Sequence, residues 1–261
     1  MDVVLRCGVY LPRRFTRGRI AVMSSAFRTV LPELLDELSP NDPRACQSRR
    51  DLRRVHRAMG SLRILKDAIE RLRLAKRPQR VLELGAGDGS LMLRLAQAIN
   101  PPWRAVSLTL LDRHDLLSAQ TREAYQALGW QLTVLREDAL DWAVARDAEP
   151  IDLCITTLFL HHFDTNTLPV LLRGIALNAD AFVACEPRRN QIAEVGSKLI
   201  GLLGVNQVTR ADAVKSVAAG FRAQELTALW PKISQPWTCE EYAALPFIHC
   251  FTAVRTECRH G

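Results

Sequence analysis

Three kinds of signal are missing from this chain of 261 residues. Its seven cysteines form no Cys-x-x-Cys pair, so neither a disulfide framework nor a zinc site is indicated. No apolar run reaches the ~18 residues that a membrane-spanning helix needs. Four arginines between positions 13 and 19 interrupt any apolar core of a secretory signal. A reducing cytosol is therefore the simplest compartment for the chain.

The charge is unevenly distributed. The composition is ordinary for a globular protein, with 48% hydrophobic and 24% charged residues, and the length suits one or two domains. Residues 1–80 hold 19 Lys or Arg against 8 Asp or Glu, whereas residues 81–261 hold 16 against 20. The net charge of +7 therefore comes entirely from the N-terminal part. Such a basic flank suits nucleic acid, an anionic membrane or an acidic partner.

The N-terminal part divides into a tail and helices. Residues 1–23 show no period and read as a basic, flexible tail, with Met23 as an alternative start. Residues 24–39 predict a short helix, and residues 48–75 a long one whose N-cap is Ser48, with Asp51 at the third position. Arginines lie mostly off its apolar stripe and form either a solvated face or a membrane- or phosphate-binding one. We expect residues 24–77 to form a cap of helices.

From Arg80 onward, short apolar runs alternate with helical or turn-rich stretches. The runs are rich in Val, Ile, Leu and Thr, as in buried strands of a parallel sheet covered by helices on both faces. They span residues 80–85, 105–112, 130–138, 151–160 and 181–187. A helical insertion is expected at about 188–220, followed by two strands, 222–230 and 246–256, that can form a hairpin. The pattern predicts a doubly wound α/β domain over residues 78–261.

The strongest motif is a glycine-rich loop that directly follows the first of these strands. It reads Glu-Leu-Gly-Ala-Gly-Asp-Gly-Ser over residues 83–90 and opens a helix. Glycines at 85, 87 and 89 allow a tight turn and a close approach to a ligand. The spacing differs from the G-x-G-x-x-G of dinucleotide sites, although NAD remains a rival cofactor. No Lys-Ser/Thr pair follows, which excludes a phosphate-cradling P-loop.

Three carboxylates, one before the glycines and two after later strands, stand in an order that suits one ligand. Asp112 ends the second strand, where a carboxylate can accept hydrogen bonds from both hydroxyls of a ribose. Asp138 follows the third strand and suits an adenine amino group, or it is an ordinary loop acid. Glu83 precedes the glycines, where it can reach a cationic amino-acid moiety.

Together, E-x-G-x-G-x-G, Asp112 and Asp138-Ala139 resemble the class I S-adenosylmethionine-dependent methyltransferase family. The resemblance covers about residues 78–255 and implies a seven-stranded sheet whose last strand is antiparallel. It also implies S-adenosyl-L-methionine as the cofactor. Residues carried over as cofactor-binding are Glu83, Gly85, Ala86, Gly87, Gly89, Asp112, Arg113, Asp138, Ala139 and Thr157.

The exit of the fourth strand carries candidate catalytic residues. His161 and His162 stand at the edge where ligands of open α/β sheets bind. A histidine there can take a phenol or enol proton, or orient the acceptor, and at least one of the two is expected to be structural. Glu186 follows the fifth strand and either orients a histidine, binds the acceptor, or caps Arg188 or Arg189.

The same segment limits the classes of methyl acceptor that the chain is expected to use. Enzymes that methylate amino groups of adenine or glutamine resemble a pattern of Asn/Asp-Pro-Pro-aromatic here, which this chain lacks, and no Pro-Cys dipeptide supplies a cytosine-type thiolate. Phe159 and Phe163 instead predict an apolar, substrate-binding pocket. The His-His pair resembles methyltransferases of natural products and quinones.

Two further segments resemble bacterial methyltransferases that accompany type III polyketide synthases. They are residues 208–221 and 51–60, and the resemblance implies a lipidic phenol, resorcinol or quinone acceptor. Arg210 and Asp212 are expected to touch this acceptor or to pair with each other.

The sequence therefore predicts an enzyme that methylates oxygen or activated carbon of a small apolar acceptor. Two alternatives stay open. The first is an RNA methyltransferase that uses the basic N-terminal part, although its arginines lack interleaved aromatic residues, so no specific nucleic acid is expected. The second is a non-catalytic cofactor-binding scaffold. A cytoplasmic protein that meets an anionic membrane through its basic helices is the expected setting.

Overall fold

The computed structural model describes residues 27–145, 149–244 and 246–256, so the predicted tail 1–23 and Met23 lie outside the described residues. The strands are β1 Arg80–Leu84, β2 Ser107–Asp112, β3 Gln131–Arg136, β4 Leu153–Thr157, β5 Ala181–Pro187, β6 Trp237–Ala244 and β7 Ile248–Arg255. The α-helices are α1 Leu34–Glu37, α2 Pro43–Ala58, α3 Ser61–Arg71, α4 Ser90–Ala98, α5 Ala119–Ala127, α6 Ala139–Val144, α7 Leu168–Asn178, α8 Gln191–Leu199, α9 Gln207–Ala218 and α10 Glu225–Leu229. Two 3-10 helices are η1 Leu160–His162 and η2 Ile200–Leu203.

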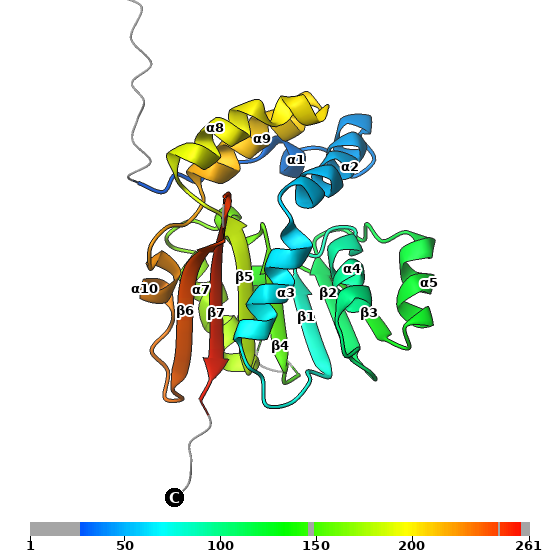
Figure 1. Ribbon diagram of the computed structural model, residues 1–261, viewed down its shortest axis with the longest axis vertical. Coiled ribbons are helices and arrows are strands. Elements are labelled where there is room, and N and C mark those ends of the chain that lie inside the picture. The colour runs from blue at the N-terminus through cyan, green and yellow to red at the C-terminus, as the bar shows by residue number, and fades with distance from the viewer. Residues whose placement is uncertain (1–26, 146–148, 245, 257–261) are drawn as a thin grey trace, which may run out of the picture.

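The seven strands form one sheet in the order β3-β2-β1-β4-β5-β7-β6 (Figure 1). The first five strands are parallel, and β7 runs antiparallel to both β5 and β6. This arrangement confirms the predicted α/β class and the antiparallel last strand. It places the carboxyl ends of β1 and β4 side by side at the centre of one sheet edge, where the strand order reverses.

Helices cover both faces of the sheet and divide the core in two. Along the strands, side chains alternate between the faces, so Val81 and Leu153 enter one core while Leu82 and Cys154 enter the other. The first core includes apolar residues of α3, α4 and α5, and the second includes those of α6, α7 and α10. Burial on both faces explains why the parallel strands read as nearly continuous apolar runs.

The prediction of a strand at 222–230 is wrong. Residues 225–229 form helix α10, and its first turn is capped by Glu241, which accepts hydrogen bonds from the backbone amides of Leu226 (3.1 Å) and Thr227 (2.8 Å). The true partner of β7 is β6, an edge strand whose side chains are half-buried or exposed. A short apolar run does not by itself distinguish a helix from a strand, and a tertiary capping contact decided this one.

The prediction of one long helix over 48–75 is also wrong, because the helix begins earlier and is divided. Asp42 caps α2 through the amide of Arg44 (2.8 Å), and Pro43 occupies the first turn. Gly60, with φ of +68°, separates α2 from α3. The expected N-cap Ser48 lies inside α2 instead. In the expected helix 24–39, the described residues are helical only over the single turn α1.

Helices α1, α2, α8 and α9 with η2, which we name the cap, lie over the carboxyl edge of the sheet (Figure 1). Buried polar side chains connect the N-terminal helices of the cap to α9, which lies far away in the sequence. The hydroxyls of Ser48 and Thr209 lie 2.6 Å apart, and Asp51 accepts a hydrogen bond from the amide of Asn206 (2.8 Å). Asp212 in α9 accepts bonds from two amides at the start of α1. The cap is thus built from segments about 160 residues apart.

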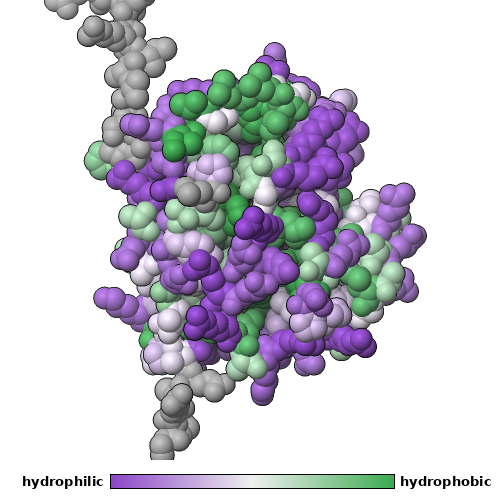
Figure 2. Space-filling view, in the orientation of Figure 1, coloured by the Kyte–Doolittle hydropathy of each residue, from purple (hydrophilic) through white to green (hydrophobic). Residues whose placement is uncertain are grey.

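One face of the cap exposes apolar side chains. They follow the helical spacing of α8 into η2, and Figure 2 shows them gathered beside the hydrophilic surface of α2. Their exposed fractions are 62% for Ile192, 57% for Val195, 55% for Leu199 and 84% for Leu202. Among the described residues, no helix has both the length and the apolar character needed to cross a membrane.

Candidate active site

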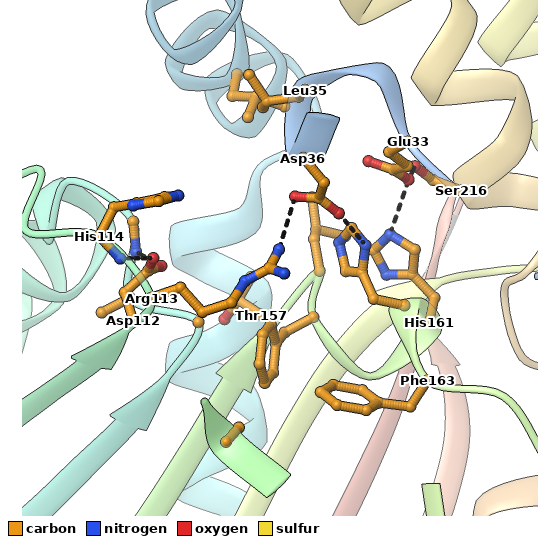
Figure 3. Close-up of a pocket in the computed structure, with 18 of the residues that line it drawn as sticks. Glu33, Leu35, Asp36, Asp112, Arg113, His114, Thr157, His161, Phe163 and Ser216 are labelled. Carbon is orange, nitrogen blue, oxygen red and sulfur yellow. Dashed lines mark hydrogen bonds and ion pairs between the residues drawn. The ribbon is translucent and has the colours of Figure 1, made fainter. Parts of the chain in front are cut away.

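A cavity of about 690 Å³ lies between the carboxyl ends of β1–β4 and the cap. Its walls come from the loops that follow these four strands, and its roof from residues 30–36 and from α2 (Figure 3). Open α/β sheets bind their ligands at this edge. Two groups of polar side chains face the cavity, one around the glycine loop and one around η1.

The glycine loop has a backbone that few other residues can adopt. Gly85, Gly87 and Gly89 have φ values of +71°, +55° and +66°. A Cβ atom on Gly85 would lie 2.2 Å from Cδ2 of Phe159, so that ring packs directly on the loop. A Cβ on Gly87 would meet nothing within 4 Å, and there the φ value alone favours glycine. Gly89 precedes α4 and does not line the cavity.

Glu83 is a buried carboxylate beside this loop. Its Oε2 atom has no hydrogen-bond partner among the described residues. Burial, reinforced by the negative charges of Asp88 and Asp112, raises the pKa of Glu83 from 4.5 to about 8. The side chain therefore lacks a cation, and an ammonium group placed against it would restore its charged form.

Asp112 and Asp138 hold the next two loops. Asp112 ends β2 and accepts hydrogen bonds from the amides of Gly87 (2.9 Å) and His114 (3.0 Å). Asp138 caps α6 through the amide of Leu140 (2.8 Å). Ionised carboxylates accept about four hydrogen bonds, so both retain free acceptor positions. Other predicted cofactor residues on the cavity wall are Ala86, Arg113, Ala139 and Thr157.

His161 and Glu186 form the buried centre of the second group. Nδ1 of His161 lies 2.9 Å from Oε2 of Glu186. Glu186 also accepts hydrogen bonds from three backbone amides of residues 159–161. The carboxylate therefore fixes both the ring and the loop that carries it, which corresponds to the orienting role among the roles predicted for Glu186. Arg189, one of its predicted partners, pairs instead with Glu225.

Glu33 approaches the other side of the His161 ring. Its Oε1 atom lies 3.4 Å from Nε2 of His161, and the Ser216 hydroxyl donates to the same carboxylate (Figure 3). Burial disfavours the charged ring, but the attraction of the Glu186 and Glu33 carboxylates outweighs it and raises the pKa of His161 to about 9. Burial likewise opposes the charge of Glu33, but its ion pair with His161 outweighs this and lowers the pKa of Glu33.

His162 lies beside His161 with a ring-centroid separation of 4.3 Å. Its Nδ1 atom is 3.3 Å from Asp36, which also lies 3.4 Å from Arg113. The His162 side chain is 27% exposed and is thus more accessible than that of His161. Both histidines line the cavity, so the structure brings the whole predicted His-His segment to it.

Sequence reasoning missed Glu33, Asp36 and His56. Glu33 precedes the single helical turn α1 and Asp36 lies within it, and neither carries a motif. They reach the histidines only because the cap folds over η1. His56, on α2, also lines the cavity, and burial lowers its pKa to about 4. No local pattern would have identified these residues.

The predicted acceptor residues divide into two pairs. Phe159 and Phe163 line the cavity and contact each other edge to face, with centroids 5.1 Å apart. Arg210 and Asp212 lie outside the cavity lining, which corrects their placement. Asp212 caps α1, and Arg210 donates to the carbonyl of Val205 (3.2 Å). They serve the packing of the cap because α9 turns this face toward α1 and η2.

Comparison with known proteins gives a match to one domain family over part of the chain. A protein-family model described as a methyltransferase domain matches residues 81–177, which contain the glycine loop, Asp112, Asp138 and the two histidines. This match covers less than half of the chain, and it makes residues 81–177 similar to a methyltransferase domain. No curated protein matches the chain by sequence.

Solved structures share the fold at low sequence identity. The plantazolicin methyltransferase BpumL in complex with SAH aligns with a TM-score of 0.57 and 12% identity, over 83% of this chain and 92% of that one. BamL, with a desmethylPZN analogue and SAH, gives 0.56 and 15% over 82% and 92%. The mitomycin 7-O-methyltransferase MmcR gives 0.52 and 21%, over 85% of this chain and 60% of MmcR. These matches confirm the sheet architecture.

Proposed function

We propose that this protein is an S-adenosylmethionine-dependent methyltransferase that transfers a methyl group to oxygen or activated carbon of a small, largely apolar acceptor such as a phenolic lipid, a quinol or a polyketide-like compound. The observation that carries the proposal is that His161, held from behind by the buried Glu186, lies on a cavity wall that also presents Phe159 and Phe163. An acidic hydroxyl can meet the imidazole while its ring or chain contacts the aromatic side chains. MmcR, a mitomycin 7-O-methyltransferase, shares the fold, which is consistent with a small-molecule acceptor.

The donor side of the cavity fits the cofactor. Glu83 presents a buried carboxylate oxygen without a partner, as a cationic amino-acid moiety requires. Asp112 would accept hydrogen bonds from ribose hydroxyls and Asp138 from an adenine amino group. Thr157 has a buried hydroxyl that also lacks a partner among the described residues. The bound cofactor supplies an electrophilic methyl group on a sulfonium.

The acceptor side must orient an oxygen and remove its proton. Glu186 holds Nδ1 of His161, so Nε2 faces the cavity and Glu33. With a pKa of about 9, His161 is protonated at neutral pH and donates a hydrogen bond to the acceptor oxygen. His162 is the more exposed ring and is the residue that accepts the proton. The cap and the two phenylalanines exclude water from the cavity.

The experiment that tests this function is methyl transfer from labelled cofactor to a panel of phenolic lipids, quinols and bulk RNA. We expect label in the phenolic or quinol fraction and none in RNA. Label in RNA alone would support the RNA methyltransferase alternative, in which affinity would fall steeply with salt. Binding of S-adenosylhomocysteine without transfer to any acceptor would favour the scaffold alternative.

We also propose that the cap contacts an anionic membrane. The exposed apolar stripe of α8 and η2 lies beside the basic face of α2, and this pairing is typical of interfacial helices (Figure 2). The exposed arginines of α2 are Arg44, Arg50, Arg53, Arg54 and Arg57. A lipidic acceptor would then enter from the surface to which the cap is bound.

Vesicle sedimentation tests the membrane contact. We expect binding to vesicles that contain phosphatidylserine, and little binding to phosphatidylcholine alone. The double variant Leu199→Ser with Leu202→Ser should lose binding, whereas Val144→Ser, at an equally exposed apolar side chain on α6, should retain it. Equal binding to both vesicle types would contradict the proposal. If the wild-type protein self-associates and the double variant does not, the apolar stripe is an interface between copies of the protein, which would also contradict it.

A further inference from the structure

Three side chains converge at the acceptor end of the cavity with the spacing of metal ligands. Glu33, His161 and His162 each offer one ligand atom, and these atoms all lie within 4.8 Å of one another. Oε1 of Glu33 is 3.4 Å from Nε2 of His161. Two ligand atoms that share a tetrahedral ion at ~2.1 Å lie about 3.4 Å apart, so this pair already has the required separation.

The Nε2 atom of His161 is a second and independent indication. It is buried and makes no hydrogen bond among the described residues. The opposite ring atom, Nδ1, is held by Glu186 at 2.9 Å. A histidine that ligates a metal usually donates its other ring N–H to a carboxylate in this way. The Ser216 hydroxyl orients Glu33 similarly, and Asp36 lies 3.3 Å from Nδ1 of His162.

We propose that Glu33, His161 and His162 bind one divalent transition-metal ion, with Zn²⁺ as the preferred ion among those tested below. Two histidines and one carboxylate form a common three-ligand catalytic site that leaves a position open. Imidazole ligands favour zinc or cobalt, whereas magnesium and calcium require oxygen ligands. The open position faces the cavity, and its natural occupant is the hydroxyl oxygen of the acceptor.

This inference rests on the proposed function for the identity of that fourth ligand. It also replaces the hydrogen bond proposed from His161, because Nε2 must release its proton to solvent before it binds the ion. A hydroxyl bound to the cation loses its proton to solvent more readily, because the electron pair left on oxygen is stabilised by the ion. The cation would therefore replace His162 as the group that favours the ionised acceptor. It would also hold the acceptor oxygen at one fixed point of the cavity.

The site also joins the cap to the catalytic loop. Glu33 belongs to the segment before α1, whereas both histidines belong to η1 after β4. One ion bound by both segments would hold the cavity roof against its wall. Metal binding is then expected to protect residues around α1 from proteolysis, a readout that does not depend on turnover.

The test uses untagged, full-length protein that has been treated with a chelator and then titrated with metal alone. Calorimetry should show one Zn²⁺ per chain, weaker binding of Co²⁺ and no binding of Mg²⁺. The Co²⁺ form should show the visible absorption of a low-coordinate N/O site. Glu33→Gln and His162→Ala should each weaken Zn²⁺ binding by more than about 100-fold, and Ser216→Ala by about 10-fold, as expected for an outer partner.

His114→Ala is the matched control, because this histidine also lines the cavity but lies on the cofactor side. It should bind Zn²⁺ as the wild type does. Zn²⁺ affinity that is unchanged in both Glu33→Gln and His162→Ala would overturn the proposal and assign the ion to cysteines or other groups. Absence of Zn²⁺ binding would also overturn it. Binding of S-adenosylhomocysteine, measured in parallel, distinguishes failure of the metal site from failure of the proposed function.

Discussion

The carboxylate of Glu186 lies 2.9 Å from Nδ1 of His161 because β4 and β5 are neighbouring strands. Thr157 at the end of β4 pairs with Cys185 in β5, so Glu186, the next residue of β5, lies beside the loop that follows β4 and carries His161. In addition to its contact with the ring, Glu186 accepts hydrogen bonds from three backbone amides of the same loop. One side chain therefore positions both the histidine and the segment that presents it to the cavity.

Glu186→Gln should reduce turnover without weakening cofactor binding. The NH₂ group of glutamine would face N–H groups whose hydrogen bonds the carboxylate now accepts, so the His161 ring would lose its fixed orientation. We expect kcat to fall by about 10²-fold or more, while the Kd for S-adenosylhomocysteine changes little. Turnover on the acceptor found in the panel and calorimetry measure the two effects. Glu194→Gln, in an exposed ion pair with Lys198, is the control and should leave both values unchanged.

Asp112→Ala should weaken cofactor binding. The variant removes the acceptor proposed for the ribose hydroxyls and the bond that holds the Gly87 amide. Loss of hydrogen bonds to a charged group predicts a Kd for S-adenosylhomocysteine that is at least about 10–100-fold higher. Asp115→Ala removes an exposed carboxylate three residues away that pairs with Arg122, and its Kd should match that of the wild type. Equal affinities for the two variants would refute the assignment of Asp112.

Glu83 predicts how the stability of the cofactor-free protein depends on pH. Its folded pKa of about 8 lies above the ordinary value of 4.5, so the folded state favours the protonated form. The free energy of unfolding therefore carries no penalty from Glu83 below pH 4.5, and it decreases as the pH rises from 4.5 toward 8. Glu83→Gln should remove this loss, so that the variant is more stable than the wild type at pH 8 by a few kcal/mol. Denaturant unfolding at pH 5 and 8 measures the difference, and an identical pH slope for both proteins would count against it.

The same residue predicts proton release on cofactor binding. An ammonium group beside Glu83 would lower its pKa, so a proton should leave the wild-type protein when S-adenosylhomocysteine binds at pH 7. Calorimetry in buffers of different ionisation enthalpy reports this release. In Glu83→Gln, the contribution of this proton to the buffer dependence of the binding enthalpy should disappear.

Gly85→Ala should be more damaging than its backbone alone explains. Its φ of +71° costs an alanine about 1–2 kcal/mol, and the contact with Phe159 adds about 1–3 kcal/mol of overpacking. Gly129→Ala is the matched control, since Gly129 has the same φ but meets nothing within 4 Å of an added Cβ. In a Phe159→Ala background the two glycine variants should destabilise equally. A penalty for Gly85→Ala that persists in that background would exclude Phe159 as its source.

The sequence predicted most of the sheet because its signals were local. Buried parallel strands produce apolar runs, and the run that ends at Leu84 leads directly into glycines that need positive φ. The errors lay where local signals were ambiguous. Glu241 caps α10, Gly60 divides the expected long helix, and Arg210 turns away from the cavity, and each outcome depends on a contact that sequence periodicity does not contain.

By itself, the sequence determined the fold class, the glycine loop with its carboxylates, and the two histidines after β4, because strand order and turn chemistry place them at one edge of a sheet. Only the tertiary structure decided what surrounds those histidines. Glu33 reaches His161 across 128 positions because the cap closes over η1, held by bonds such as that of Ser216 to Glu33. Residues so distant in sequence become neighbours only through packing, and their mutual charges then set the protonation of the site.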